Sequence, residues 1–329
     1  EEGRSRPRAL PLASPHRERL WAALPWLVLA VGVLLRLRMY FFNRALLMDE
    51  QMLALNLVNR TVPELFEQLD HNQGAPIGFL LLSKAALEFL GRHEMALRLV
   101  PLLASLASLG LFYALARRVL EPFGLLVALT LFAVGEYLVD YSSQLKQYST
   151  DVFFTLAVMA VVFRQRHDPL TFPRAAAFAL LGATVVWFSH AAVLVLAAVG
   201  IALGISALLQ RDRRRVTALV AVGAVWAASL ALCYLVSLRG LTQNDYLLGY
   251  WQKYFMPLPP MNRHDVRWFM DIPIMAFWQP VGLTYPGLGA LAFLSGVFAL
   301  YRRDRQALWL LMAPVLMTLL LSGLHVYPF

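Results

Sequence analysis

The first apolar stretch of the chain, residues 21–42, reads WAALPWLVLAVGVLLRLRMYFF. A helix rises about 1.5 Å per residue, so this stretch is long enough to cross the hydrocarbon core of a bilayer. A polar segment with five arginines, at positions 4, 6, 8, 17 and 19, precedes it. Because arginines collect on the cytoplasmic side of membrane proteins, we predict a cytoplasmic N-terminus and an outer location for residue 43.

The whole chain is too apolar for a soluble globular protein. Of its 329 residues, 59% are hydrophobic and 15% are charged, against about 45–50% and 25% in soluble domains. The net charge of +9 comes from short clusters of cations between apolar segments. This pattern is typical of membrane orientation and does not indicate nucleic-acid binding. The single cysteine, Cys233, excludes a disulfide framework and a cysteine-ligated zinc site.

The basic clusters also fix the direction of the later apolar segments. They all become cytoplasmic only if the segment 77–90 does not cross, and its 14 residues are too few to span. We predict that this segment is a juxtamembrane or re-entrant helix. We therefore predict an all-α, polytopic transmembrane bundle of about nine spans, forming a single domain over residues 1–329. The predicted spans are 21–42, 95–116, 123–139, 150–163, 175–187, 191–209, 216–238, 288–300 and 308–324.

This topology places three segments on the outer face of the membrane, namely residues 43–94, 140–149 and 239–286. We expect the first of them to contain juxtamembrane helices at 51–59 and 63–69, where apolar residues recur at helical spacing. The third is rich in aromatic residues, which suit a membrane interface. The chain ends at Phe329 without a polar tail, so we expect it to be the N-terminal part of a longer protein.

Two adjacent carboxylates, Asp49 and Glu50, follow the first span. Carboxylates next to hydrocarbon cost free energy, which indicates a functional site. A second interpretation is that Asp49 caps the helix that follows, in which case Glu50 lies in its first turn and complements the helix dipole. Asp151 is the third candidate acid, and it is open to the same capping interpretation.

Several cations lie on the same predicted outer face of the membrane as these carboxylates. Transfer of a group from a lipid phosphate needs a base for the acceptor hydroxyl and cations for the departing phosphate. Lys146 is our first candidate for the phosphate, together with Arg36, Arg38 and Arg44 near the outer end of the first span. Arg36 and Arg38 have an alternative role, in which they extend to the membrane interface.

Four further residues are predicted to line the substrate site: His71, Gln73, Tyr141 and His190. The two histidines have structural alternatives, since His71 fits a solvated turn and His190 fits a position at the membrane interface. The chain has no nucleotide-binding glycine motif and no His-Glu-x-x-His motif. We predict no metal site and no cofactor, although the dependence on a divalent metal stays open.

An ordered series of motifs resembles the GT-C membrane glycosyltransferases. It consists of Leu47-Met-Asp-Glu50, Gly74-Ala-Pro-Ile-Gly-Phe79, Glu94-Met-Ala-Leu-Arg-Leu-Val-Pro101, and Tyr141-Ser-Ser through Ser-Thr-Asp151. The similarity is to the bacterial branch of protein O-mannosyltransferases and aminoarabinose transferases. It implies that Asp49 is the essential first-loop carboxylate, that Asp151 is a second acidic residue of the site, and that a polyprenyl-phosphate sugar donates with inversion.

The sequence departs from this family at one point. Aminoarabinose transferases carry a basic residue before the proline of the first loop, where this chain has Gly74-Ala-Pro76. The donor phosphate must therefore be bound by another cation, and Lys146 or the arginines near Arg36 are the candidates.

Two functions remain from these observations. The first is an inverting glycosyltransferase at the outer, periplasmic face of the bacterial cytoplasmic membrane, with a polyprenyl-phosphate sugar and a glycan, lipid or protein acceptor as substrates. The second is a transporter or flippase of a lipid-linked sugar, which binds the phosphate but does no chemistry. A transporter is expected to show paired broken helices or repeated halves, and the sequence shows neither.

Overall fold

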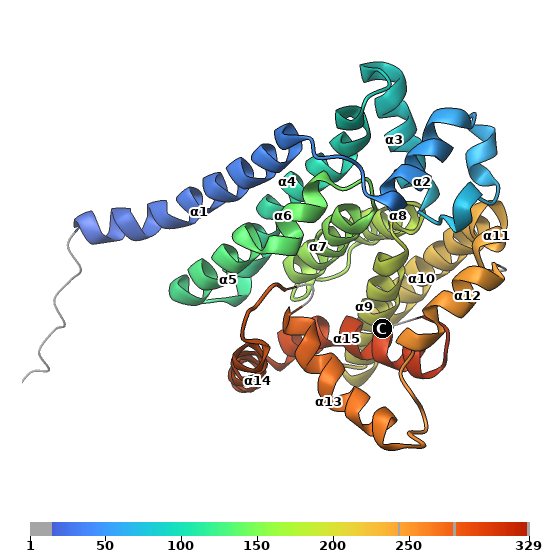
Figure 1. Ribbon diagram of the computed structural model, residues 1–329. Helices are drawn as coiled ribbons and strands as arrows, with labels where there is room; N and C mark the ends of the chain where they lie inside the picture. Colours follow the sequence, from blue (N-terminus) through green and yellow to red (C-terminus); the bar gives the residue numbers. More distant parts are fainter. Residues whose placement is uncertain (1–14, 243, 279–280, 328–329) are drawn as a thin grey trace, which may run out of the picture.

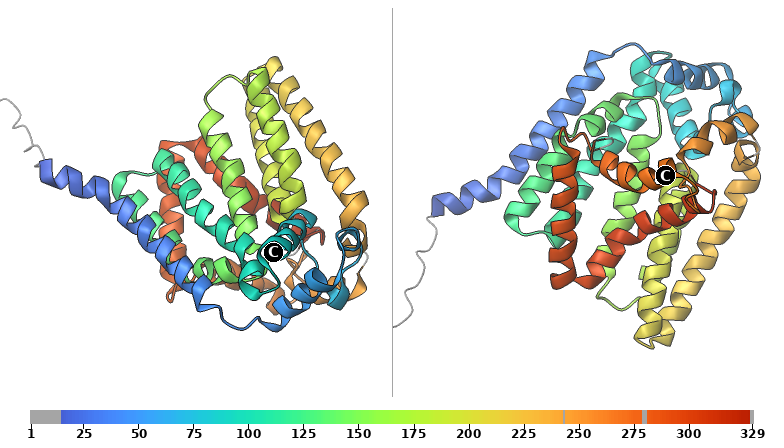
Figure 2. Two further views of the ribbon diagram at one scale, coloured as in Figure 1. Left: turned by 90° about the horizontal axis from the view of Figure 1, so that it is seen from above. Right: turned by 60° about the horizontal axis from the view of Figure 1, so that its bottom comes forward.

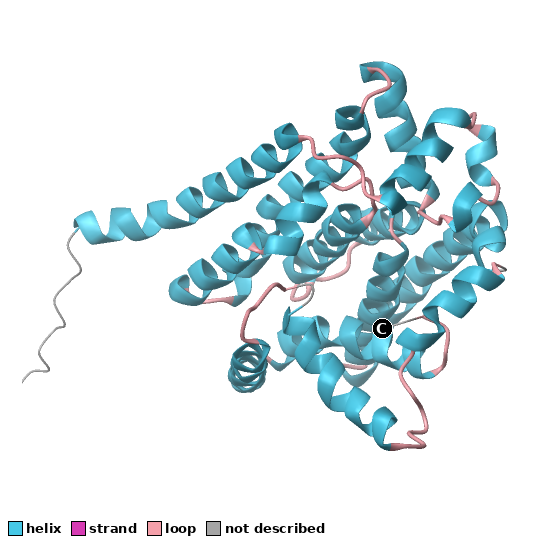
Figure 3. Ribbon diagram, in the orientation of Figure 1, coloured by secondary structure: helices cyan, strands magenta, loops and turns pink. Residues whose placement is uncertain are grey.

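A computed structural model describes residues 15–242, 244–278 and 281–327, and these residues form helices and connecting loops without any strand (Figure 3). The predicted all-α class is confirmed. Among the described residues, five helices are long and apolar enough to cross a membrane, which indicates a multi-pass membrane protein. They are α1 (Pro15–Phe42), α4 (Glu94–Val119), α9 (His190–Leu209), α10 (Arg213–Cys233) with its continuation Tyr234–Leu238, and α15 (Arg305–Gly323).

A sixth candidate span is broken. The sequence predicts a continuous helix over 123–139, but the structure has α5 (Pro122–Val134) and α6 (Glu136–Asp140), with a bend of 52° between the two halves. The break falls at Gly135, where a Cβ atom would lie only 2.8 Å from the carbonyl oxygen of Leu131. Glycine is therefore the residue that permits this bend.

Three shorter helices cover the remaining predicted spans. They are α7 (Tyr148–Gln165), α8 (Phe172–Phe188) and α14 (Pro286–Arg303), with 18, 17 and 18 residues. These lengths are close to the minimum of about 17 residues that a crossing needs. The count of nine spans stays a prediction.

Helices α7 to α10 pack together around a shared hydrophobic core. Helices α8 and α9 are joined by Ser189 alone, and α10 runs beside them (Figure 2). The buried Trp226 of α10 donates a hydrogen bond to the backbone oxygen of Phe178 in α8 at 3.2 Å. Helix α15 packs on α9, whereas α1 lies at the edge of the bundle against α4 and α5 (Figure 1).

The first predicted outer segment contains α2 (Met48–Asn59) and α3 (Ile77–Leu90). Helix α3 has the predicted bounds, but the predicted helix at 63–69 is reduced to one 3₁₀ turn, Pro63–Phe66. At Gly78 of α3 a Cβ atom would lie 2.6 Å from the ring of Phe188 in α8. This close approach fixes α3, and the loop before it, on the end of the central bundle.

The third predicted outer segment is also helical in part. It contains α11 (Arg239–Thr242), α12 (Asp245–Trp251) and α13 (Arg263–Trp278). It reaches the first segment through two contacts, because the Nδ2 of Asn244 donates to the Oδ1 of Asn72 at 3.0 Å and Gly240 lies against Gln68. These two segments therefore lie in contact, and their location on the outer face of the membrane stays a prediction.

Candidate functional site

Asp49 does not cap α2, so the capping interpretation is wrong. The helix begins at Met48, with Leu47 in the N-cap position. The reason lies in Glu50, whose Oε2 accepts the backbone N–H of Leu47 at 3.0 Å and so closes the first turn. The Asp49 side chain is 53% exposed, and its Oδ2 lies 3.2 Å from the Nζ of Lys146.

Glu50 has a different environment from its neighbour. Its side chain is fully buried. While Oε2 accepts from Leu47, Oε1 accepts the backbone N–H of Leu145 at 2.7 Å. Leu145 belongs to the second predicted outer segment, so Glu50 joins that segment to the first. Both oxygens of this candidate acid are thus occupied by backbone donors.

Lys146 contacts two other predicted site residues. Its Nζ donates to the Oε1 of Gln73 at 3.1 Å and contacts Asp49 at 3.2 Å, while only 12% of its side chain is exposed. The amide of Gln73 is oriented by a second bond, from Nε2 to the backbone oxygen of His71 at 3.3 Å. His71 itself is exposed and adopts φ +60°, as expected for a turn residue. The structure therefore brings together the predicted base, the predicted phosphate ligand and one predicted lining residue.

Three tyrosines, Tyr137, Tyr141 and Tyr148, pack in a row near Asp49. The rings of Tyr141 and Tyr148 are 4.7 Å apart, and those of Tyr137 and Tyr141 are 6.0 Å apart. Burial raises the pKa of Tyr141, and the nearby Tyr137 and Asp140 add to this effect. Tyr148, which the sequence did not single out, interacts electrostatically with both Asp49 and Asp151.

Asp151 lies in the first turn of α7, where Gln147 occupies the N-cap position. The capping interpretation is wrong here too, because the Oδ1 of Asp151 accepts the hydroxyl of Ser189 at 2.5 Å instead. The Oγ of Ser189 in turn accepts the N–H of Ala192 and so caps α9. His190 follows as the first residue of α9. Asp151 thus ties α7 to the turn between α8 and α9.

Arg36 is a packing residue in this structure. It is 1% exposed, and it donates to the Oγ of Ser105 at 2.7 Å and to the backbone oxygens of Gly32, Phe132 and Ala133. The last two oxygens lie at the end of α5, where the helix breaks and its carbonyls lack helical partners. Both predicted roles, phosphate binding and extension to the interface, are corrected by this arrangement. Arg38 lies two residues further along α1 and is exposed.

Arg44 and a residue that we did not predict, Arg98, lie next to Glu50. The Nη2 of Arg44 is 3.6 Å from Glu50 and 3.6 Å from Asp140. Arg98 of α4 is fully buried, and its Nη1 donates to the Oδ1 of Asn43 at 3.0 Å. Among the described residues, the Nε and Nη2 atoms of both arginines have no hydrogen-bond partner. The Nη2 of Arg44 still forms its two ion pairs, whereas a fully buried guanidinium with unpaired donors, such as that of Arg98, is suited to bind an anion or water.

Comparisons with known proteins add no identity to this geometry. No family model matches the chain, and no curated protein matches it. Within the part of the chain that the structure describes, no three His, Cys, Asp or Glu side chains group closely enough to hold a metal ion. The dependence on a divalent metal stays open.

Proposed function

We propose that this protein is an inverting glycosyltransferase, which moves a sugar from a polyprenyl phosphate to an acceptor hydroxyl at the outer face of the bacterial cytoplasmic membrane. The observation that carries the proposal is the pair of Asp49 and Lys146, 3.2 Å apart, with the carboxylate half exposed and the ammonium mostly buried. A base and a cation side by side are the two groups that this reaction requires.

The reaction can be written on these two residues. The acceptor oxygen attacks the anomeric carbon of the sugar, and the bond from that carbon to the phosphate oxygen breaks, with its electrons going to the phosphate. The carboxylate of Asp49 takes the proton of the acceptor hydroxyl. The ammonium of Lys146 offsets the charge that develops on the departing polyprenyl phosphate.

The contact between the two residues also gives an order of events. Without a donor, the ammonium of Lys146 is the partner of Asp49. The phosphate of a bound donor competes for the same ammonium and leaves the carboxylate available to the acceptor hydroxyl. Donor binding therefore prepares the base.

The position of Lys146 supports the resemblance at the point where the sequence departs from it. The first loop has Gly74 and Ala75 before its proline, and neither side chain can hold a phosphate. Lys146 comes from another loop but is bonded to Gln73, the residue just before this motif. Lys146 thus offers a cation next to the same loop in which aminoarabinose transferases carry a basic residue.

A transporter or flippase of a lipid-linked sugar is the second candidate. The bent pair α5 and α6 is the one broken helix among the described candidate spans, whereas transporters typically place two such breaks around a site at the midplane. The carbonyls of Phe132 and Ala133 at this break accept hydrogen bonds from Arg36, so a side chain of the protein already occupies them.

The two candidates differ in whether the bond between the sugar and the phosphate is broken, and the following experiment measures this. The purified chain is incubated in vesicles with polyprenyl-phosphate sugars extracted from bacterial membranes. We expect free polyprenyl phosphate and sugar-labelled acceptor to form. Movement of intact donor across the bilayer without cleavage would instead establish a transporter.

A further inference from the structure

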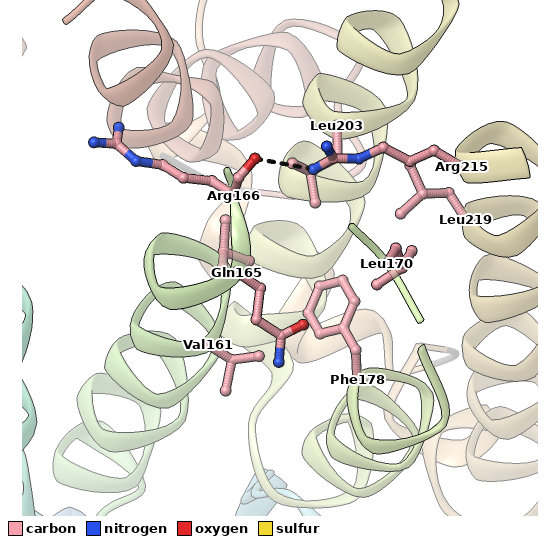
Figure 4. A pocket seen from close by; sticks show the side chains of 9 residues that line it. Val161, Gln165, Arg166, Leu170, Phe178, Leu203, Arg215 and Leu219 are labelled. Atoms are coloured by element: carbon pink, nitrogen blue, oxygen red, sulfur yellow. Dashed lines mark hydrogen bonds between the residues drawn. The ribbon is translucent and has the colours of Figure 1, made fainter. Parts of the chain in front are cut away.

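A small pocket, open on one side, lies at the end of α7 that carries Gln165, opposite to the end near Asp151 (Figure 4). It is lined by residues of α7, the loop after it, α8, α9 and α10. Its lining is mostly apolar and includes Val161, Phe178, Leu203 and Leu219. The side chains of Gln165 and Arg215 bring polar groups to it, whereas the guanidinium of Arg166 turns away (Figure 4).

Arg215 is the cation of this pocket. Its Nη2 donates to the backbone oxygen of Arg166 at 3.2 Å, just after the end of α7. No partner is described for its Nε and Nη1. The carboxylate nearest in sequence, Asp212, is engaged elsewhere, because its Oδ1 accepts the backbone N–H of Arg215 at 3.0 Å and caps α10.

The surroundings of the pocket carry an excess of positive charge. Two arginines here are paired, Arg166 with Asp304 at 2.6 Å and Arg174 with Asp168 at 3.1 Å. Five others form no ion pair with a carboxylate among the described residues, namely Arg164, Arg211, Arg213, Arg214 and Arg215. The guanidinium of Arg166 is itself mostly buried, with 10% of the side chain exposed, and its Nη1 has no described hydrogen-bond partner.

We propose that the mouth of this pocket binds one anionic phospholipid, with the phosphate on Arg215 and the beginning of an acyl chain against the partly exposed Leu170 and Leu219. The apolar lining disfavours a small hydrated anion, because such an ion gains nothing from apolar contacts and loses its water. The unpaired arginines favour an anionic over a zwitterionic headgroup. The predicted topology also places this end of the bundle in the cytoplasmic leaflet, whose surface is negatively charged and whose lipids bind to basic pockets between helices.

A structural interpretation of Arg215 requires a separate control. Its bond to Arg166 alone would make it a cap of α7, which needs one N–H donor but no charge. Arg215→Gln keeps an amide donor and removes the charge. Arg213→Gln removes the same charge from an exposed position in the same cluster that does not line the pocket.

The test uses the full chain purified in detergent, titrated with phosphatidylglycerol or phosphatidylcholine and observed by native mass spectrometry. We expect one phosphatidylglycerol to bind in preference to phosphatidylcholine, and we expect Arg215→Gln to weaken it about tenfold. Arg213→Gln is expected to change the affinity less than about twofold, and excess inorganic phosphate is expected not to compete. Equal binding of the two lipids, equal losses in the two variants, or displacement by phosphate would overturn the proposal.

A second measurement does not depend on the folding of a variant. Phosphatidylglycerol with a photoreactive acyl chain is cross-linked to the unaltered chain, and the modified peptides are identified. Adducts on the ends of α8, α9 and α10 that form the pocket are expected. Adducts spread evenly over the apolar helices would contradict a specific site.

Discussion

The ammonium of Lys146 lies 3.2 Å from the carboxylate of Asp49. Only 12% of the lysine side chain is exposed, against 53% of the aspartate side chain. The two residues come from different segments, which Glu50 joins through its bond to Leu145. The acid is thus the more exposed of the two groups, which in the proposed reaction makes it accessible to an acceptor, and the cation is held by the protein. Catalytic groups need this kind of fixed placement.

Lys146→Met tests the phosphate ligand. A charge-assisted bond to the donor phosphate is lost, so we expect donor binding to weaken by about tenfold or more. The affinity for a polyprenyl-phosphate sugar, measured by titration in detergent, checks this expectation. Unchanged affinity in a folded protein would move the phosphate to Arg44 and Arg98, whose unused donors lie nearby.

The chain supplies a matched control for this substitution. Lys253 is exposed, and its Nζ lies over the rings of Tyr250 and Tyr254 at 5.2 and 5.0 Å. Lys253→Met removes the same charge from the same predicted face of the membrane. We expect it to leave donor affinity within about twofold, since a distant exposed charge contributes little.

Glu50→Ala tests the contact that Glu50 makes between the first two predicted outer segments. The substitution removes the acceptors of two backbone N–H groups and one of the two carboxylates next to Arg44. Loss of one partner from such a buried group costs about 3–5 kcal/mol, so we expect a clear fall in the thermal unfolding temperature in detergent. Glu67→Ala, on the exposed surface of the same segment, serves as the control. If both variants unfold at the same temperature, the contact of Glu50 with Leu145 does not stabilise the protein.

Arg36→Met tests the packing role that replaces a predicted phosphate role. The backbone oxygens of Phe132 and Ala133 lose their donor at the break between α5 and α6. Each unsatisfied buried group costs about 1–3 kcal/mol, so the variant is expected to be less stable. Arg38→Met, at the exposed position two residues away, is expected to match the parent protein. A stable Arg36→Met protein with reduced donor affinity would restore the phosphate role.

The side of the membrane is tested by cysteine labelling at Arg117, in the last turn of α4. In a Cys233→Ala background we expect Arg117→Cys to resist an impermeant maleimide until the membrane is opened. Glu67→Cys is the control and is expected to react from outside. Labelling of the cysteine at position 117 from outside would invert the predicted topology.

The apolar helices and the meeting of the outer segments were predictable from the sequence, for physical reasons. Long apolar runs such as that of α9 have few alternatives to a spanning helix, and α3 is bounded by Pro76 and Gly91, both of which disfavour continuation of a helix. The sequence also assigned Asp49, Gln73 and Lys146 to one candidate site, but it did not predict the contacts between them.

The features that the sequence analysis predicted wrongly or missed depend on contacts between residues far apart in the sequence. The start of α2 is set by Glu50, and the state of Glu50 is set by Leu145 of another loop. In the same way, Asp151 pairs with Ser189 across two helices. Arg98 lies inside an apolar helix, and only the structure shows that its guanidinium is buried beside Asn43. Local patterns carry no signal for such pairs.

The central claim is that Asp49 is the base, and the turnover of Asp49→Asn tests it most directly. Because Leu47 and not Asp49 occupies the N-cap position, the substitution removes no helix cap. We expect a protein with parental stability that still binds the donor, and a rate of sugar transfer lower by about 10² to 10⁴. Turnover near that of the parent protein would show that Asp49 takes no proton, and it would contradict the enzymatic account.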